Sequence, residues 1–439
     1  PWESLVVAAP KSHSKIQKPT GEFIVERNLR IPMRDSTELG ATLWRPKRAG
    51  RYPALVERGP HRLDERTGPA GEYYAARGYC VLGVGLRGCS GSGGEMRGPI
   101  PGSPQGDGYD TIEWTAVQDW CNGHVGMLCG SISGLTQYQT AVEAPPHLDA
   151  LLVREGIFGM GGRRSAFSPL ALHFVAASWT ENQLEHYPPE KLAKAKRLVR
   201  RWRQSAKEAH QNADPESPFA PVPKIIERLP LYPNPLFAEV ASYYNDFLVP
   251  PKKPGWAAEA AFDRHADKTQ APICHLGGWF DSTIHSTLAA FTSMQTNAAT
   301  PQARQAQRLI VGPWTHGPAN THGNPVGLLE FGPNAKLDFM AFRQRWYDAQ
   351  LRRKGSLKDD PVVWLYLIGP DRWLGCETWP PPQMQETPWY LHTGALKSTA
   401  PSGAQNPDAF EYDPDDPVRT LKDGGAMSIG ADQRPNEDR

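Results

Sequence analysis

Three side chains of the kinds used in nucleophilic catalysis follow apolar, strand-like segments. Ser131 lies between HVGMLCG and the helix-like segment SISGLTQYQTAVEA, Asp281 follows APICHLGGWF, and His316 follows RLIVGPWT. Groups just beyond the carboxyl ends of strands meet at one edge of an α/β sheet, where ligands bind. A Ser hydroxyl attacks once an imidazole takes its proton, and a carboxylate orients that imidazole. We therefore predict Ser131 as nucleophile, His316 as base and Asp281 as the orienting acid.

The segment around Ser131 predicts a sharp turn between a strand and a helix. This is the context of a nucleophile elbow, and the chain order Ser, Asp, His is that of α/β hydrolases. The G-x-S-x-G pattern is not met, because Cys129 and Ser133 occupy the two outer positions. A Ser between glycines is more often an ordinary turn, but its place between strand and helix favours a nucleophile. Ser133 is the competing candidate, and the backbone N–H of Ile132 is the expected oxyanion donor.

The elements around these residues predict a largely parallel sheet with helices on both faces. Residues 22–60 alternate apolar and polar positions, as half-buried antiparallel strands do. Strand and helix patterns then alternate, which is typical of the α/β class. From 361 short β runs separated by Pro and Gly suggest a β-sandwich, too short to be complete. We predict four parts: an α/β-hydrolase domain in two pieces, 1–164 and 266–360, an inserted helical cap, 165–265, and a partial C-terminal β domain, 361–439.

The bulk properties exclude several classes of function. The 439 residues carry a formal net charge of +1, so no strong field points to nucleic acid or a membrane surface. The basic face of 190–208 is read as solvated. No 18-residue apolar run predicts a membrane span. The chain start lacks a signal-peptide pattern, and the scattered cysteines suggest free thiols, so we expect a cytoplasmic protein. We expect no metal or other cofactor, since the histidines show no HExxH-like spacing.

The chain resembles the cocaine esterase and X-Pro dipeptidyl-peptidase family, the CocE/NonD-type hydrolases. The similar segments include MRDSTELGATLWRP, DGYDTIEWTAVQDWCNGHVGMLCGSISGLTQ, GGWFDS, LIVGPWTHG and GADQRP, and they run from about residue 22 to the end. The resemblance implies an α/β-hydrolase domain, an inserted helical cap and a C-terminal jelly-roll. It places the family's nucleophile, acid and base at Ser131, Asp281 and His316.

The chain departs from this family at three places near the site. Cys129 replaces the usual Gly, and Ile132 replaces the Tyr that normally follows the nucleophile. In RGPH the place of the Tyr that supplies the second oxyanion donor holds His61. A neutral imidazole can donate one hydrogen bond, so His61 is the candidate for that role. The alternative is that His61 faces solvent and the oxyanion hole has one donor. The jelly-roll is also shorter than the family's, which continues beyond a DQRP-like segment.

The leading function is hydrolysis of a carboxylic ester or amide through an acyl-enzyme. An acyltransferase or an X-Pro-type peptidase would use the same triad, and a non-catalytic protein of the hydrolase fold is the alternative from another class. The expected partner is a small ester or amide substrate, and homo-oligomerisation is left open. The aromatic residues Trp179, Trp279 and Phe280 are candidates to line an acyl pocket, although aromatics in a cap more often pack.

Overall fold

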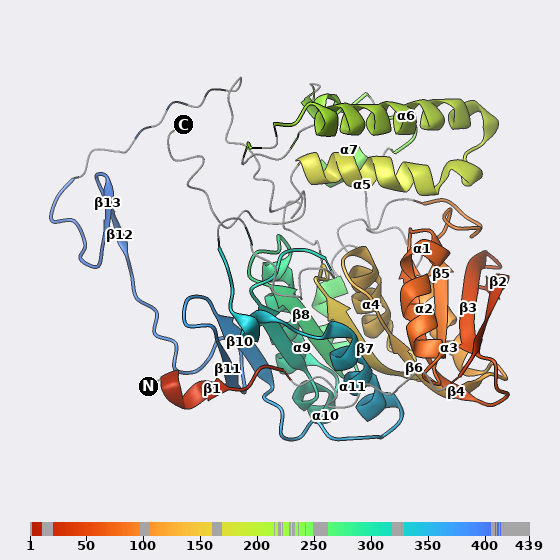
Figure 1. Cartoon of the computed structure of the whole chain (residues 1–439), viewed down its shortest axis with the longest axis horizontal. Helices are drawn as coiled ribbons and strands as arrows, with labels where there is room; N and C mark the ends of the chain where they lie inside the picture. Colours follow the sequence, from red (N-terminus) through yellow and green to blue (C-terminus); the bar gives the residue numbers. More distant parts are fainter. Residues whose placement is uncertain are drawn as a thin grey trace.

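One mixed sheet forms the centre of the molecule (Figure 1). The computed structural model describes residues 2–10, 21–96, 106–159, 169–214, 262–317 and 329–404, together with parts of 216–248, residue 326 and a few residues up to 413. Among these, eleven strands form the sheet in the order β1-β11-β10-β9-β8-β7-β6-β4-β5-β3-β2. Their bounds are β1 Val6–Val7, β2 Phe23–Pro32, β3 Glu38–Pro46, β4 Tyr52–Gly59, β5 Cys80–Gly85, β6 Cys121–Met127, β7 Leu148–Arg154, β8 Ile273–Gly278, β9 Arg308–Gly312, β10 Val363–Leu367 and β11 Arg372–Cys376.

The middle of the sheet is parallel and its edges are antiparallel. Strands β5, β4, β6, β7, β8, β9 and β10 run in one direction, whereas β3 and β2 close one edge and β11 and β1 the other. Every residue of β5 and β8 is buried. Strands covered on both faces need such unbroken apolar runs, which is why the sequence pattern identifies them.

Helices cover both faces of the sheet, as the alternating pattern predicts. Successive strand residues point to opposite faces, so Leu151 packs in one hydrophobic cluster and Leu152 in the other. The first cluster contains side chains of α3, α4 and α9, and the second contains side chains of α2 and α11. The helix bounds are α1 Leu63–Arg66, α2 Gly68–Ala75, α3 Asp107–Ala116, α4 Ile132–Glu143, α9 Ile284–Asn297, α10 Pro301–Gln305 and α11 Phe339–Leu351.

The segment predicted as a cap contributes helices α5 (Pro169–Asn182), α6 (Pro189–Gln211) and α7 (Tyr243–Leu248). Figure 1 shows α5 and α6 lying side by side above the sheet. The segment contacts the loop that follows β5: the Gly91 N–H donates to His186 Nε2 at 3.2 Å, and Gln183 contacts Met96. These contacts lie at the carboxyl edge of the parallel strands, the edge where the sequence places the candidate site.

The strands after residue 361 belong to two different structures. Strand β10 pairs in parallel with β9, and β11 pairs with both β10 and β1, so the main sheet extends to Cys376 rather than ending at 360. Strands β12 (Tyr390–His392) and β13 (Ala395–Lys397) form a separate hairpin. Most residues after 404 lie outside the described part of the chain, so a jelly-roll there stays a prediction.

Candidate active site

Ser131 lies in a strained turn between β6 and α4. Its backbone has φ 59° and ψ −123°, and Cys129 also has a positive φ of 99°. Such conformations cost a non-Gly residue about 1–3 kcal/mol each and persist only where the surroundings enforce them. The residue between them is Gly130, where a Cβ would lie 2.4 Å from the carbonyl oxygen of Arg154. The turn therefore requires Gly130, and its strain marks Ser131 as a functional candidate.

Strand β7 holds this turn in place. The Ser131 N–H donates to the carbonyl oxygen of Arg154 at 2.9 Å, and Gly130 forms a parallel bridge with the same residue. The Ser131 side chain is half-buried. Ser133, the competing candidate, is fully buried, and its hydroxyl donates to Glu57 Oε1 at 3.1 Å. Of the two serines, Ser131 is thus the more exposed.

Asp281 and His316 meet beyond the ends of β8 and β9. His316 Nδ1 lies 2.9 Å from Asp281 Oδ1. The carboxylate is fully buried and also accepts the Thr283 N–H at 3.0 Å and the Thr283 hydroxyl at 2.6 Å. These bonds fix the carboxylate, so the structure brings two of the three predicted residues into direct contact. A hydrogen bond between His316 and Ser131 stays a prediction.

The electrostatics around His316 favour the charged imidazole. Burial alone disfavours the charged form, but the hydrogen bond to Asp281 and the charges of Glu155 and Asp281 outweigh burial, and they raise the pKa of His316 above its ordinary value of 6.5. Arg154 acts in the opposite direction. A base whose protonated form is stabilised suits a step that creates imidazolium.

Glu155 is a residue of this site that the sequence analysis missed. It follows Arg154 at the end of β7, and only 1% of its surface is exposed. Both of its carboxylate oxygens accept the Gly317 N–H, at 3.0 and 2.9 Å, and one lies 3.7 Å from His316 Nδ1. The available signal was its place directly after the apolar segment LDALLVR, the same kind of position as that of Asp281.

His61 lies in the loop after β4, and Ile132 is the first residue of α4. Burial, with a smaller contribution from the nearby Arg66 charge, lowers the pKa of His61 to about 4. The ring is therefore neutral near pH 7 and keeps one N–H to donate. The N–H of Ile132 is at a helix start, where amide hydrogens lack an intrahelical acceptor. Both expected oxyanion donors thus have the required chemical form, and their convergence on one point stays a prediction.

Cys129 lies beside charged groups at the turn. The charges of Glu57 and Arg66 act on its thiol, and the residue is partly exposed. Burial, together with the Glu57 charge, raises the pKa of Cys129, so the thiol is neutral near pH 7. A neutral thiol is a poor nucleophile compared with a thiolate. Cys129 therefore acts as a turn residue in a position where Gly would be less strained.

The three aromatic candidates make packing contacts. Trp179 is buried in α5 with its ring 5.7 Å from that of Tyr243. The Trp279 indole donates to the carbonyl oxygen of Tyr366 at 2.8 Å, and Phe280 lies 5.8 Å from the Phe331 ring. Trp179 is buried and the other two are partly buried, and these contacts account for that without a ligand. Their role in substrate binding stays a prediction.

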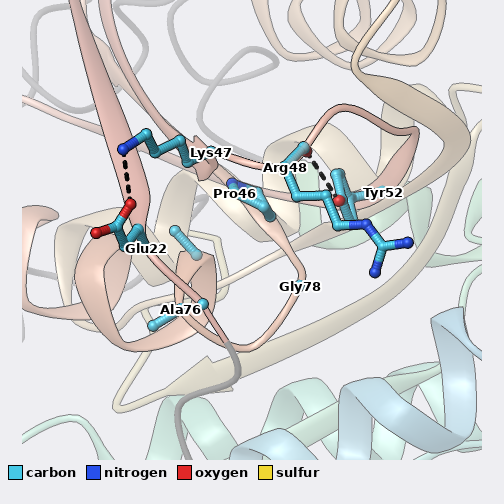
Figure 2. A pocket seen from close by; sticks show the side chains of 9 residues that line it. Glu22, Pro46, Lys47, Arg48, Tyr52, Ala76 and Gly78 are labelled. Atoms are coloured by element: carbon cyan, nitrogen blue, oxygen red, sulfur yellow. Dashed lines mark hydrogen bonds and ion pairs between the residues drawn. The ribbon is translucent and has the colours of Figure 1, made fainter.

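A pocket at the opposite edge of the sheet has no part in this site. Figure 2 shows its lining around the Glu22–Lys47 ion pair and Tyr52, whose hydroxyl donates to the carbonyl oxygen of Arg48. Tyr52 begins β4 and Gly78 precedes β5, so the pocket lies at the amino ends of the parallel strands.

Within the described ranges, no group of three or more His, Cys, Asp or Glu side chains could hold a metal ion. No helix there is long and apolar enough to cross a membrane.

The mixed sheet, the helices on its two faces and its likeness to solved structures define the fold as that of the α/β hydrolases. An aminopeptidase from the marine sediment archaeon Thaumarchaeota archaeon aligns over 97% of this chain and 72% of its own, with TM-score 0.70 and 21% identity. A CocE/NonD family hydrolase from Staphylococcus aureus aligns over 86% and 60%, with TM-score 0.53 and 19% identity.

The chain belongs to the X-Pro dipeptidyl-peptidase (S15) family, whose model matches residues 35–318. The cocaine esterase of Rhodococcus sp. (strain MB1 Bresler) is 28% identical over 453 aligned residues, which cover 95% of this chain and 73% of the relative. The chain is thus an enzyme of the hydrolase class, in a family of serine hydrolases, and the predicted resemblance is confirmed.

Proposed function

We propose that this enzyme cleaves small carboxylic esters through an acyl-enzyme formed on Ser131. The observation that carries the proposal is the strained Ser131 turn at the same sheet edge as the bonded pair His316–Asp281. Because Nδ1 of His316 faces Asp281, the tautomer with hydrogen on Nδ1 carries its lone pair on Nε2, which is the nitrogen that can accept a proton. The arrangement matches what a Ser-His-Asp mechanism needs.

The reaction begins when the Ser131 oxygen attacks the substrate carbonyl and His316 Nε2 takes the hydroxyl proton. The negative charge on the carbonyl oxygen is met by the N–H of Ile132 and the ring N–H of His61. Collapse of the tetrahedral intermediate expels the alcohol, which takes the proton from His316. Water, deprotonated by the same imidazole, then attacks the acyl-enzyme and releases the acid. Helices α5 and α6 act as a cap over the bound substrate, and Trp179, Trp279 and Phe280 contact its acyl group.

The same machinery suits amide cleavage or acyl transfer, and the family match makes an X-Pro peptide the specific amide to test. A panel of a p-nitrophenyl acylate, an X-Pro p-nitroanilide and an ester with added alcohol separates esterase, peptidase and transferase. We expect the ester to be the best substrate. Faster turnover of the X-Pro anilide would overturn the choice of ester in favour of the peptidase.

Covalent labelling tests the nucleophile and decides between an enzyme and a non-catalytic protein of the same fold. A fluorophosphonate probe should modify Ser131, and mass spectrometry of the digested protein should find the label there. S131A should not be labelled, whereas S133A should be. A label on Ser133 would contradict the assignment of the nucleophile. A protein that takes up no label and hydrolyses no ester would contradict the proposed function.

A further inference from the structure

Glu155 and the residue before it, Arg154, connect the three segments that carry the candidate triad. Its own N–H donates to the carbonyl oxygen of Leu276 in β8 at 2.7 Å, close to the strand end that leads to Asp281. Its carboxylate accepts the N–H of Gly317, next to His316. The preceding residue, Arg154, accepts the N–H of Ser131.

The conformation and burial of Glu155 are costly for a residue with only a structural role. Its φ is 53°, a left-handed conformation that favours Gly, and its carboxylate is almost wholly buried. A buried charge requires compensation, which here comes from Arg154 Nε at 3.3 Å and from the Gly317 N–H. A residue that served only to pair with Arg154 would not need to place both oxygens on Gly317 and one of them 3.7 Å from His316 Nδ1.

We propose that Glu155 is a positioning residue for the base: its carboxylate fixes the backbone that carries His316 and adds a second negative charge beside that of Asp281. The inference rests on the proposed function, and it assigns to the imidazole two carboxylates rather than one. Asp281 binds Nδ1 directly, and Glu155 acts from the neighbouring strand end through Gly317 and through its charge. Among the described residues, Arg154 is a further charged group that acts on the ring, and it opposes both carboxylates.

The charge of Glu155 favours imidazolium, which forms in the transition state. The Glu155 charge contributes to the raised pKa of His316, and burial in turn raises the pKa of Glu155 above its usual range. Removing this charge should lower the pKa of His316. Imidazolium then forms less readily, so kcat should fall by up to about tenfold.

The test compares E155Q and E155D with E113Q. The Gln amide oxygen can still accept the Gly317 N–H but carries no charge, whereas Asp keeps the charge. Glu113 is a matched control, because its carboxylate also binds a histidine through both the backbone N–H, at 3.1 Å, and the ring, at 2.7 Å, in His147 before β7. We expect E155Q to move the acidic limb of the kcat/KM profile to lower pH, and E155D and E113Q to leave it in place.

A titration of the His316 ring by NMR provides a readout that does not depend on turnover, so failure of the inference is separable from failure of the proposed function. The pKa of His316 should fall in E155Q and not in E113Q. An unchanged pKa with a lowered Tm would make Glu155 purely structural and overturn the inference. If E155Q does not fold, D281N provides a second test, because it leaves Glu155 as the carboxylate beside His316. His275 shows what burial does without such a charge, since it lowers the pKa of that ring to about 4. In D281N the pKa of His316 must therefore stay well above about 4. A fall into that range would also overturn it.

Discussion

The carbonyl oxygen of Arg154 accepts the N–H of Ser131 at 2.9 Å, so the end of β7 supports the turn that carries this proposed nucleophile. The next residue, Glu155, binds the backbone beside His316. Two consecutive residues at one strand end therefore hold the segments of the proposed nucleophile and the proposed base. A change in the backbone at the end of β7 should therefore displace both Ser131 and His316.

Replacing the nucleophile should abolish turnover without unfolding the protein. We expect S131A to lower kcat on a p-nitrophenyl acylate by roughly 10⁴-fold or more. S133A should keep most activity but lose about 1 kcal/mol of unfolding free energy, because it removes the buried hydrogen bond to Glu57. Steady-state kinetics and urea unfolding measure the two effects. Loss of activity in S133A alone would move the nucleophile to Ser133.

Removing the charge of Asp281 should make His316 a poorer general base. In D281N the side chain keeps its size, but it no longer favours the tautomer with hydrogen on Nδ1 of His316, and we expect kcat to fall by about 10³–10⁴-fold. The variant D149N is a suitable control, because Asp149 also binds a histidine ring, that of His124, but at the start of β7. Equal activity of D281N and the unmodified enzyme would exclude Asp281 as the acid.

The second oxyanion donor is tested at His61. We expect H61A to lower kcat by about 10²-fold while KM changes little, because this bond strengthens only in the transition state. H61Y, which restores the hydroxyl expected from the family, should retain or raise activity. Since the pKa of His61 is about 4, its donor should not titrate between pH 5 and 8. An unchanged kcat in H61A would remove His61 from the oxyanion hole.

The activity of the enzyme should rise with pH through the titration of His316. Protonated His316 cannot accept the hydroxyl proton, and its pKa is raised above 6.5. The acidic limb of the kcat/KM profile should therefore lie above pH 6.5, with full activity only at higher pH. A profile over pH 5–9 measures it. A limb well below 6.5 would mean that burial outweighs the two carboxylates.

Gly130 should tolerate no side chain. The Cβ of G130A would lie 2.4 Å from the Arg154 carbonyl oxygen, so the turn must shift and Ser131 with it. We expect G130A to lose about 1–3 kcal/mol of stability and most of its activity. G21A is the control, because a Cβ on Gly21 meets no atom within 4 Å. A fully active, equally stable G130A would show that the turn can adapt.

The sequence patterns identified the residues whose roles depend on local context. Ser131 stands between a strand pattern and a helix pattern, and Asp281 and His316 each follow an apolar run, so neighbouring residues were enough to propose them. The bond between His316 and Asp281 then follows from the parallel pairing of β8 with β9. Trp279 shows the limit of this reasoning, because its indole partner, the Tyr366 carbonyl, belongs to a strand added much later in the chain.

The position of Glu155 beside His316 and the strands at the sheet edge beyond β9 depend on strand order. Local sequence patterns do not reveal strand order. LDALLVREG indicates a strand followed by a charged turn, and nothing in it places Glu155 beside His316. The segment PVVWLYLIG resembles a sandwich strand by composition. Its parallel pairing with β9 in the main sheet is a contact between distant segments, so composition could not reveal it.

The two-residue strand β1 forms the edge of the sheet opposite β2, where it pairs with β11 from much later in the chain. Val6 and Val7 pair with Leu374 and Trp373 of β11. During synthesis on the ribosome, residues 6 and 7 emerge well before residues 373 and 374 and have no partner until then. Strands β2 to β9 can pair before that time. Closure of this edge is therefore expected to follow the assembly of those strands, and until it occurs β11 presents an open row of hydrogen-bonding groups to any other chain.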